Sequence, residues 1–508
     1  MQSHEQFAEM YEMRRAAEPP VVPHIIGGAE RYDGRRLLRE NPAYPDTTAS
    51  VFHDAPAELA SEAVAASREA QAVWRRLPLV ERVERVGRAI PELQRRSLEF
   101  ATRIALETGK PFGSCVSEVE EVLAFLTQYT RFSLREEAFS ETYPAPAEGV
   151  ANLTVLKPYG VFGVITPFNY PFALSAGPMI AALLAGNGVV IKSASRGPWS
   201  GYSAYEITTW MDLPAGLVSL VHGSSAISRA VIDAGLDGAA FTGSVAVGMS
   251  IVRQYASGPH AKPVIAEMGG KNPLIISQGA DLEAAVPGIM FSSFDISGQK
   301  CSSLSRILIT PGMIDELVDL LRPHVEGFVV GPPDRADSRI GPVVSGEAVA
   351  EYHRILDAAR AEGFEVVTSS EAVPSGHMVR PALIVGVPAG HWLATEEHFL
   401  PILTISEVPS FRHALEEANR LDIGLTAGLC TGDKSHAEAF LDEMHAGSIT
   451  VNVSGHATTG WWPGLSTFGG WKASGSTGKQ GYGKSYVQQF ARQQSSKVPA
   501  EWRDLLSY

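Results

Sequence analysis

Cys301 and Glu267 are two residues whose types could together carry out covalent catalysis. A cysteine thiolate can attack an electrophilic carbon, and a glutamate can activate the water molecule that later releases the product. Taken alone, a cysteine in a glycine-rich segment is more often a small buried hydrophobic residue than a nucleophile. A glutamate beside Gly269 and Gly270 is by default a capping or turn residue. The pair therefore predicts a thiol-dependent reaction followed by hydrolysis only where other segments support it.

The stretches around this pair are expected to alternate strands and helices, as in a protein built on parallel sheets. A first set of strands is indicated by apolar runs at residues 160–166, 188–192 and 218–222, with helices between them at residues 176–185 and 202–211. A second set is indicated by strands at residues 273–276 and 306–309 and by helices at residues 314–321 and 349–362. Helical spacing at residues 56–107 and 116–138 predicts further surface helices. We therefore expect an α/β fold with two sheet-containing domains.

Size and charge restrict the class of protein to which the chain can belong. Its 508 residues exceed what one hydrophobic core normally spans, and 45% hydrophobic residues are enough for two or more domains. The formal net charge of −14, with no long Lys/Arg run, argues against nucleic acid or an anionic membrane surface as the main partner. No apolar stretch is long enough to span a membrane, and the start carries Glu5, Glu9 and Glu12 instead of a secretory core. A cytoplasmic enzyme is expected.

Only three cysteines occur, Cys115, Cys301 and Cys430, and they are widely separated. This spacing offers neither a disulfide framework nor a cluster of metal ligands. Cys115 and Cys430 lie in or beside apolar and helical runs, which indicates structural roles. We therefore predict a reaction that uses one thiol and no metal.

Two segments resemble the signature segments of the aldehyde dehydrogenase superfamily. They are EMGGKN at residues 267–272 and GQKC at residues 298–301. Other segments match in the order of the family: TPFNYP at 166–171, FTGS at 241–244, EEHFLP at 396–401 and FGGWKASG at 468–475. The resemblance runs from about Ile25 to the C-terminus. It implies the aldehyde dehydrogenase-like fold, with two Rossmann-type parallel α/β domains and a small β-strand oligomerisation element.

The resemblance also implies a division of the chain. Residues 1–149 and 159–270 would bind the cofactor, 271–450 would form the catalytic domain, 451–484 would form the substrate pocket and return segment, and 150–158 and 485–508 would form the oligomerisation element. The strands of that element are expected at about residues 150–157 and 485–492. Alternating residues in the first of them suit an exposed ribbon that pairs with another subunit. A homodimer or homotetramer is therefore expected.

The cofactor implied by the family is NAD or NADP, although no Gly-x-Gly-x-x-Gly fingerprint stands at a strand-to-helix junction. In the family, the FTGS segment brings Gly243, Ser244 and helix-terminal amides to the pyrophosphate, and Lys192 reaches the adenosine ribose. Simple alternatives are a helix cap at Ser244 and a surface lysine at Lys192. The remaining cofactor-side residues implied by the family are Thr166, Pro167, Phe168, Gly223, Glu397 and Phe399, the last two at the nicotinamide ribose and ring.

Two departures from the family pattern occur among these residues. The segment KSAS at residues 192–195 places Ser195 where many NAD-preferring relatives have a glutamate. Ser195 can donate to a 2′-phosphate, and Lys192 with Arg196 offers positive charge, so NADP should be tolerated. Leu400 replaces the usual glycine after Phe399, which affects the geometry expected for that loop.

The resemblance implies a role for each catalytic residue. Cys301 would attack the aldehyde carbon, and Asn169, with the backbone N–H of Cys301, would stabilise the resulting oxyanion. Asn169 could instead simply form a turn before Tyr170. After hydride transfer, Glu267 would activate water to hydrolyse the thioester. A CoA-acylating relative or a catalytically silent homologue are the alternatives, and Glu267, Cys301 and Asn169 in their motifs together favour the hydrolytic enzyme.

The substrate is left open between two classes of aldehyde. GQKCSS at 298–303 and ENPAYP at 40–45 are most similar to the glutamate-semialdehyde (pyrroline-5-carboxylate) dehydrogenase branch, in which Ser302 would anchor a carboxylate. The backbone amides of Gly460 and Trp461 would complete that anchor, with Tyr170 and Phe468 also on the substrate side. However, the segment TGWWPG at 459–464 contains paired tryptophans that would crowd it. Trp461 and Trp462 could line a tunnel for a longer or aromatic aldehyde, or close a core or subunit interface.

Overall fold

A seven-stranded sheet forms the centre of the first lobe of the computed structural model, which describes residues 3–506. In spatial order its strands are β11 (Val264–Met268), β10 (Gly238–Gly243), β7 (Val161–Ile165), β8 (Gly188–Lys192), β9 (Val218–Val221), β1 (His24–Ile26) and β2 (Ala29–Arg31). The strands from β11 to β9 are parallel, and β1 pairs antiparallel with β9. Their apolar runs are buried almost throughout, because helices cover both faces.

Alternate residues of these strands enter two different cores. Val161, Val190 and Val221 pack with α2 (Ala57–Trp74) and α9 (Ser225–Asp233) on one face. Phe162 and Ile191 pack on the opposite face with α7 (Ala173–Leu184) and the helices around it. Those helices are α1 (His4–Ala16), α3 (Leu79–Gly87), α4 (Ala89–Arg95), α5 (Ser97–Thr108), α6 (Phe112–Ser133), α8 (Pro198–Glu206) and η1 (Ile207–Trp210). The two-residue period of a strand thus separates the two cores.

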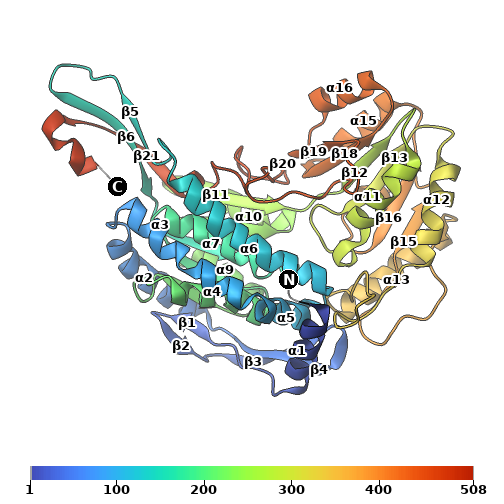
Figure 1. Cartoon of the computed structure of the whole chain (residues 1–508), viewed down its shortest axis with the longest axis horizontal. Helices are drawn as coiled ribbons and strands as arrows, with labels where there is room; N and C mark the ends of the chain where they lie inside the picture. Colours follow the sequence, from blue (N-terminus) through green and yellow to red (C-terminus); the bar gives the residue numbers. More distant parts are fainter. Residues whose placement is uncertain (1–2, 507–508) are drawn as a thin grey trace.

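The second lobe is built on a further seven-stranded sheet, which lies beside the first lobe (Figure 1). In spatial order its strands are β14 (Glu365–Val367), β15 (Ala382–Val385), β16 (Ile402–Glu407), β13 (Leu304–Ile309), β12 (Asn272–Ile276), β18 (Thr426–Cys430) and β19 (Ser448–Val451). All but β14 are parallel. The helices of this lobe are α11 (Leu282–Phe294), η2 (Asp295–Gly298), α12 (Ile314–Glu326), α13 (Gly346–Ala361), α14 (Trp392–Thr395), α15 (Phe411–Asn419) and α16 (Lys434–Glu443).

Smaller sheets complete the fold. The strands β3 (Arg35–Asn41) and β4 (Tyr44–Asp54) form a hairpin, and β17 (Ile423–Gly424) pairs with β20 (Trp471–Lys472). The remaining helix of the first lobe, α10 (Val245–Ala256), connects β10 to β11. After β19 the chain returns from the second lobe to the first along the segment that contains β20 (Figure 1). This return segment therefore lies beside both lobes.

A three-stranded sheet projects from the first lobe (Figure 1). It pairs β6 (Val150–Pro158) with β5 (Ser140–Tyr143) on one side and with β21 (Ala491–Pro499) on the other, followed by η4 (Ala500–Leu506). The strand predicted at 485–492 was wrong in position, because η3 (Val487–Phe490) precedes β21. Val487 and Phe490 are buried in the first core, which holds the chain in a turn until the strand begins. The sheet boundaries lie near the predicted domain boundaries, whose functional division stays a prediction.

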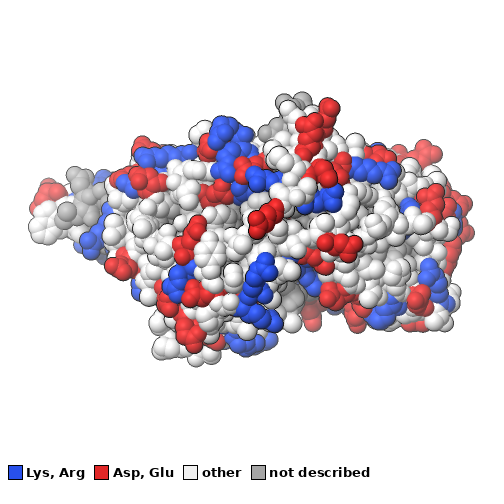
Figure 2. All heavy atoms as spheres, turned by 90° about the horizontal axis from the view of Figure 1, so that it is seen from below, with Lys and Arg blue, Asp and Glu red and all other residues white. Residues whose placement is uncertain are grey.

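Charges of both signs occur on one face of the molecule without large patches of a single sign (Figure 2). On the face shown in Figure 2, the Lys and Arg side chains are interspersed with Asp and Glu. None of the described helices is both long and apolar enough to cross a membrane. Within residues 3–506, no group of three or more His, Cys, Asp or Glu side chains could hold a metal ion.

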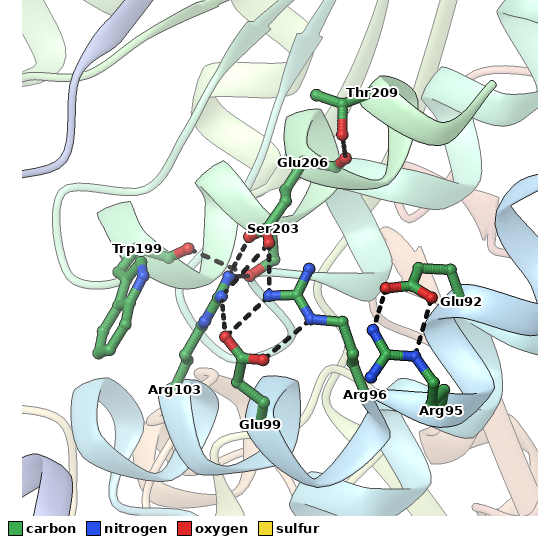
Figure 3. A network of polar contacts seen from close by, with 9 residues as sticks. All are labelled: Glu92, Arg95, Arg96, Glu99, Arg103, Trp199, Ser203, Glu206 and Thr209. Carbon is green, nitrogen blue, oxygen red and sulfur yellow. Dashed lines mark hydrogen bonds and ion pairs between the residues drawn. The ribbon is translucent and has the colours of Figure 1, made fainter. Parts of the chain in front are cut away.

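An ion-pair network ties α5 to α8 on the helical face of the first lobe (Figure 3). Glu99 lies between Arg96, at 2.9 Å, and Arg103, at 2.5 Å, and both arginines also pair with Glu206 at the end of α8. Burial would raise the pKa of Glu99, but the hydrogen bonds and charges of the two arginines outweigh burial and lower it to about 2. The network holds α8 in place after the loop that carries Ser195.

We expect Glu99→Gln to lower the melting temperature by about 2–4 °C at pH 7. Because the folded-state pKa lies below the unfolded value of about 4.3, the carboxylate stabilises the fold at higher pH and loses this effect as pH falls toward 2. The gap in melting temperature between wild type and variant should therefore stay nearly constant from pH 7 to about pH 5 and narrow as the pH falls further toward 2. Glu92→Gln is the matched control, since Glu92 pairs only with the exposed Arg95 in this network. A gap that widens at low pH would contradict the assignment.

Candidate active site

One cavity of ≈ 330 Å³ between the two lobes is lined by all three residues predicted to be catalytic, Cys301, Glu267 and Asn169. The other predicted site residues that line it are Pro167, Phe168, Gly243, Ser244, Glu397, Phe399 and Phe468. These residues come from the carboxyl ends of β7, β10 and β11, from second-lobe loops and from the return segment. The fold thus brings together motifs that are far apart in the sequence.

Cys301 follows a strained turn and precedes β13. Ile296 and Ser297 have φ angles of 53° and 55°, in the left-handed region that a β-branched residue rarely adopts. Gly298 also has a positive φ, 69°, and a side chain there would collide with the carbonyl of Leu400. The backbone before the nucleophile is therefore held by the surrounding packing.

Asn272 holds the other side of this turn. Its side-chain amide donates to the carbonyls of Cys301, at 2.7 Å, and Ser303, at 2.9 Å, and its oxygen accepts the N–H of Thr426 at 3.0 Å. Asn272 belongs to the EMGGKN segment but was not predicted as a site residue. The EMGGKN motif contains Asn272, but its hydrogen bonds to the Cys301 turn form only because distant strands pair.

The thiol of Cys301 is in an environment that favours its protonated form. Burial raises its pKa to about 12, and the carboxylates of Glu397 and Glu267 act in the same direction. The positive charge of Lys300 and the backbone N–H of Ser302 oppose them and stabilise the thiolate. The thiol is therefore neutral at rest, and Lys300 and the Ser302 N–H lower the free energy needed to ionise it.

Glu267 is the last but one residue of β11. Burial raises its pKa to about 8, although a hydrogen bond from the Gly470 N–H, at 3.2 Å, lowers it. Gly469 lies against the same carboxylate, so that a side-chain carbon there would be 3.0 Å from Glu267 Oε1. A carboxylate with a pKa near neutrality is suited to general base catalysis.

Asn169 lies on the loop between β7 and α7. It is buried, and its amide oxygen has no hydrogen-bond partner among the described residues. The loop is held by Glu118 of α6, which accepts the N–H groups of Phe172, at 2.8 Å, and Ala173, at 3.1 Å, and pairs with Lys110. Glu118 and Lys110 were not predicted, because their segment signals only a helix and a turn. They are supports of the loop that carries Asn169.

The residues predicted to bind the pyrophosphate lie at the beginning of α10. Ser244 is the N-cap residue, but its hydroxyl makes no capping hydrogen bond. A side chain at Gly248, one turn further, would collide with Met268, so glycine allows the helix to approach β11 closely. Free N–H groups at a helix N-terminus and an uncommitted hydroxyl fit a bound phosphate group.

Lys192, Gly223 and Ser195 lie at the same edge of the first sheet, though outside the residues that line the cavity. Lys192 ends β8 and is buried, and burial lowers its pKa to about 8. Its ammonium has no hydrogen-bond partner among the described residues. Gly223 has a φ of 139°, and a side-chain carbon there would lie 2.5 Å from an Asp54 oxygen. Thr166 joins this edge through its N–H to the Lys192 carbonyl, at 3.3 Å.

These observations fit a dinucleotide. Ligands of open parallel sheets bind outside the carboxyl ends of the strands, where these residues converge. Ser195 is exposed on the loop before α8, and Arg196 beside it lies 3.5 Å from Glu347. A buried, unpaired lysine is costly without an anionic or polar partner, which a ribose or phosphate would supply.

Glu397 and Phe399 line the cavity from the second lobe. Glu397 accepts the Gly270 N–H at 3.3 Å, and a side chain at Gly269 would collide with its carboxylate. Burial raises the pKa of Glu397 to about 7. Phe399 has a φ of 57°, and Leu400 is buried in the second lobe core. The positive φ of this loop thus falls on Phe399, and the Leu400 side chain packs into the core of the second lobe.

The substrate-side predictions are distributed differently. Tyr170 stacks under Lys110, with the ammonium 3.9 Å from the ring centroid, and the Ser302 carbonyl accepts the Thr458 hydroxyl at 2.8 Å. Gly460 has a φ of 96°, and the Trp461 indole donates to the Thr458 carbonyl at 3.2 Å. Among the described residues that line the cavity, only Phe468 of the predicted substrate set is present.

An aromatic wall of the cavity was not predicted. Phe125 and Tyr129 of α6 line it together with Tyr482 and Tyr486 of the return segment. The spacing of each pair is four residues, which indicates one face of a helical turn, but nothing in the spacing shows that the two pairs meet. Their contact depends on the return of the chain to the first lobe.

Comparison with known proteins supplies the class that this fold and site define. The model of the aldehyde dehydrogenase family matches residues 31–495. The 1-pyrroline-5-carboxylate dehydrogenase of Bacillus licheniformis is 32% identical over 473 residues, which cover 92% of this chain and 90% of that protein. The chain belongs to the aldehyde dehydrogenase family.

Solved structures agree with this assignment. The 1-pyrroline-5-carboxylate dehydrogenase from Thermus with bound NAD is 26% identical, with a TM-score of 0.91 over 98% of this chain and 97% of that chain. Proline utilization A from Bdellovibrio bacteriovorus is 28% identical, with a TM-score of 0.92 over 97% of this chain and 51% of that longer chain. The predicted family and α/β fold class are thereby confirmed. The chain is an oxidoreductase of the NAD(P)-dependent aldehyde dehydrogenase class.

Proposed function

We propose that this chain oxidises an aldehyde to a carboxylic acid, with NAD or NADP, through a thiohemiacetal and a thioester on Cys301. The observation that carries this proposal is the meeting of Cys301, Glu267 and Asn169 in one cavity whose walls also include Gly243, Ser244, Glu397 and Phe399. A thiol, a base and an amide in one cavity are the groups that covalent oxidation and hydrolysis require. A silent homologue would need none of them.

The first step is addition of the thiolate to the aldehyde carbon. Lys300 and the Ser302 N–H stabilise the thiolate that attacks. The Asn169 amide and the backbone N–H of Cys301 would donate to the oxygen as it becomes negative. One such donor contributes about 3 kcal/mol to transition-state stabilisation in other enzymes.

Cofactor binding is assigned to the carboxyl edge of the first sheet. Ser244 and the N-terminal amides of α10 would hold the pyrophosphate, Lys192 the adenosine ribose, and Glu397 and Phe399 the nicotinamide ribose and ring. When bound, the nicotinamide would supply the hydride acceptor. The thiohemiacetal on Cys301 becomes a thioester when its carbon loses the hydride. Glu267 then takes a proton from water as its oxygen attacks the thioester, and the acid and the free thiol are released.

The domain and assembly assignments follow from this function. Residues 1–149 and 159–270 would bind the cofactor, and residues 271–450 would carry the nucleophile. The sheet of β5, β6 and β21 would join subunits in a homodimer or homotetramer, because the described residues of β5 are exposed along an edge that another chain can cover.

Cys301→Ala should abolish aldehyde oxidation while NAD binding is preserved, because the thiol takes part in chemistry and lies apart from the adenosine edge. Reduced-cofactor absorbance measures the first quantity, and a cofactor titration measures the second. Cys430→Ala is the matched control and should keep turnover. Oxidation by Cys301→Ala at the wild-type rate would remove this residue from the mechanism.

Glu267→Gln should give a rapid burst of reduced cofactor and then stall, because acylation proceeds while hydrolysis loses its base. The wild-type steady-state rate should rise as pH passes through about 8, since the carboxylate must be ionised to accept a proton. This rise should disappear in the variant. Adding CoA tests the acylating alternative, which predicts restored turnover and an acyl-CoA product. A normal steady-state rate in the variant would exclude Glu267 as the base.

Ser195→Glu should selectively weaken the use of NADP. The added carboxylate would lie near a 2′-phosphate, where like charges repel, yet it could still accept a hydrogen bond from the 2′-hydroxyl of NAD. We expect kcat/KM for NADP to fall about tenfold or more, with a much smaller change for NAD, at fixed ionic strength. Ser195→Gln is the neutral control of similar size. An unchanged NADP-to-NAD ratio would show that Ser195 does not face the ribose.

A further inference from the structure

We propose that the cavity beside Cys301 selects aldehydes that carry an apolar, ring-sized substituent, so that aryl and arylalkyl aldehydes are preferred over amino-acid semialdehydes. This inference rests on the proposed function, because it concerns the aldehyde that Cys301 attacks. It differs from the substrate class in the names of the relatives.

Aromatic rings from α6 and the return segment form a continuous wall. The Phe125 ring lies 5.6 Å from Tyr482 and 5.3 Å from Tyr129, and Tyr482 stacks on Phe468 at 5.5 Å with an interplanar angle of 23°. Tyr486 extends the wall at 5.6 Å from Tyr129. A further ring can stack or pack edge-on against such a surface, with a gain beyond simple burial.

The polar ends of two of these tyrosines are already bonded within the protein. The Tyr482 hydroxyl donates to Glu121 at 2.6 Å, and the Tyr129 hydroxyl accepts the Tyr482 N–H at 3.3 Å. Glu121, which could otherwise pair with a substrate ammonium group, is not among the described residues that line the cavity. The two tyrosines therefore offer the cavity ring surface.

Helix α7 contributes small residues and a leucine to the wall of the cavity. Ala173 and Gly177 are four residues apart and line the cavity, and a side-chain carbon at Gly177 would lie 2.9 Å from the Phe125 ring. Leu174, between them in the sequence, is only partly buried and also lines the cavity. Its isobutyl group is thus available to contact an apolar substituent.

The size of the cavity fits two rings. A cavity of about 150 Å³ can hold benzene. The ≈ 330 Å³ available here therefore admits a nicotinamide ring beside Phe399 and Glu397 and one further ring beside Phe125 and Leu174.

The charge of the cavity disfavours an amino-acid substrate. The ionisable side chains that line it, apart from the nucleophile and the tyrosines, are the carboxyl groups of Glu267 and Glu397, and no described lining residue is cationic. Lys300, the nearest cation to Cys301 in sequence, pairs with Asp295 at 3.0 Å. A substrate carboxylate brought into this cavity would meet two carboxyl groups and no cation among the described lining residues, so the free-energy cost of removing it from water would not be offset.

The test is a comparison of kcat/KM for phenylacetaldehyde, glutamate semialdehyde and propanal, with saturating NAD. We expect phenylacetaldehyde to exceed both others by about tenfold or more. Glutamate semialdehyde equal to or better than phenylacetaldehyde would overturn this proposal and leave the proposed function intact. Failure of all three aldehydes to give reduced cofactor, even as a burst, would instead overturn the proposed function and this inference with it.

Leu174→Ala separates ring contact from general damage. It should lower kcat/KM for phenylacetaldehyde about tenfold and for propanal less than about threefold, because only the larger substituent reaches the removed carbons. Leu441→Ala, on an exposed position of α16, is the matched control and should change neither value. Equal losses for both aldehydes in Leu174→Ala would contradict the proposal.

Tyr482→Phe tests the alternative that Glu121, which is bonded to the Tyr482 hydroxyl, selects a polar substrate. It keeps the ring but removes the hydroxyl that covers Glu121, so the preference for phenylacetaldehyde over glutamate semialdehyde should remain at about tenfold or more. A preference reversed in favour of glutamate semialdehyde would show that Glu121 governs selection and would overturn the proposal.

Discussion

The short passage from the first sheet to the second constrains the whole site. Glu267 is the last but one residue of β11 and Asn272 begins β12, so the proposed base and the residue that holds the Cys301 turn are only a few residues apart although they belong to different lobes. Asn272 then ties down the Cys301 turn through two carbonyls. Because β12 is buried and β11 largely so, this short connection between two packed strands limits where Glu267 can lie relative to the Cys301 turn.

Burial has the same electrostatic effect on every ionisable group of this centre. It raises the pKa of Cys301, Glu267 and Glu397 because each would otherwise carry a negative charge away from water. The resulting pKa near 8 for Glu267 keeps part of the base protonated at neutral pH. Burial thus gives Glu267 a pKa at which a carboxyl group can both accept and release a proton, as the proposed role of base requires.

Close approach of the backbone to the reacting groups explains the glycines of the motifs. Gly269 makes room for the Glu397 carboxylate, and Gly469 lies against Glu267. The same dense packing brings α6, α7 and the return segment to one aromatic wall beside the thiol. Helices that support the fold of the first lobe therefore also line the cavity, so Phe125 and Tyr129 belong to the core and to the cavity wall at once.

Much of the fold could be predicted from local patterns. Apolar runs of strand length identified β7, β8, β9 and β12 closely, because a strand buried on both faces must be apolar at nearly every position. The strand β21 was misplaced, since Val487 and Phe490 look like strand residues locally and are held in a turn only by the first core. Long-range packing overrode local propensity there.

The sequence by itself determined the family and the α/β class, and it predicted catalytic roles for Cys301, Glu267 and Asn169, because motifs of this length depend on residue type and order alone. Only the tertiary structure decided which side chains share the cavity. Phe125 and Tyr482 are separated by most of the chain. Trp461, which was predicted as part of the substrate anchor, lies outside the residues that line the cavity. The shape and charge of a pocket arise from surfaces that meet only after folding, so local sequence carries no direct record of them.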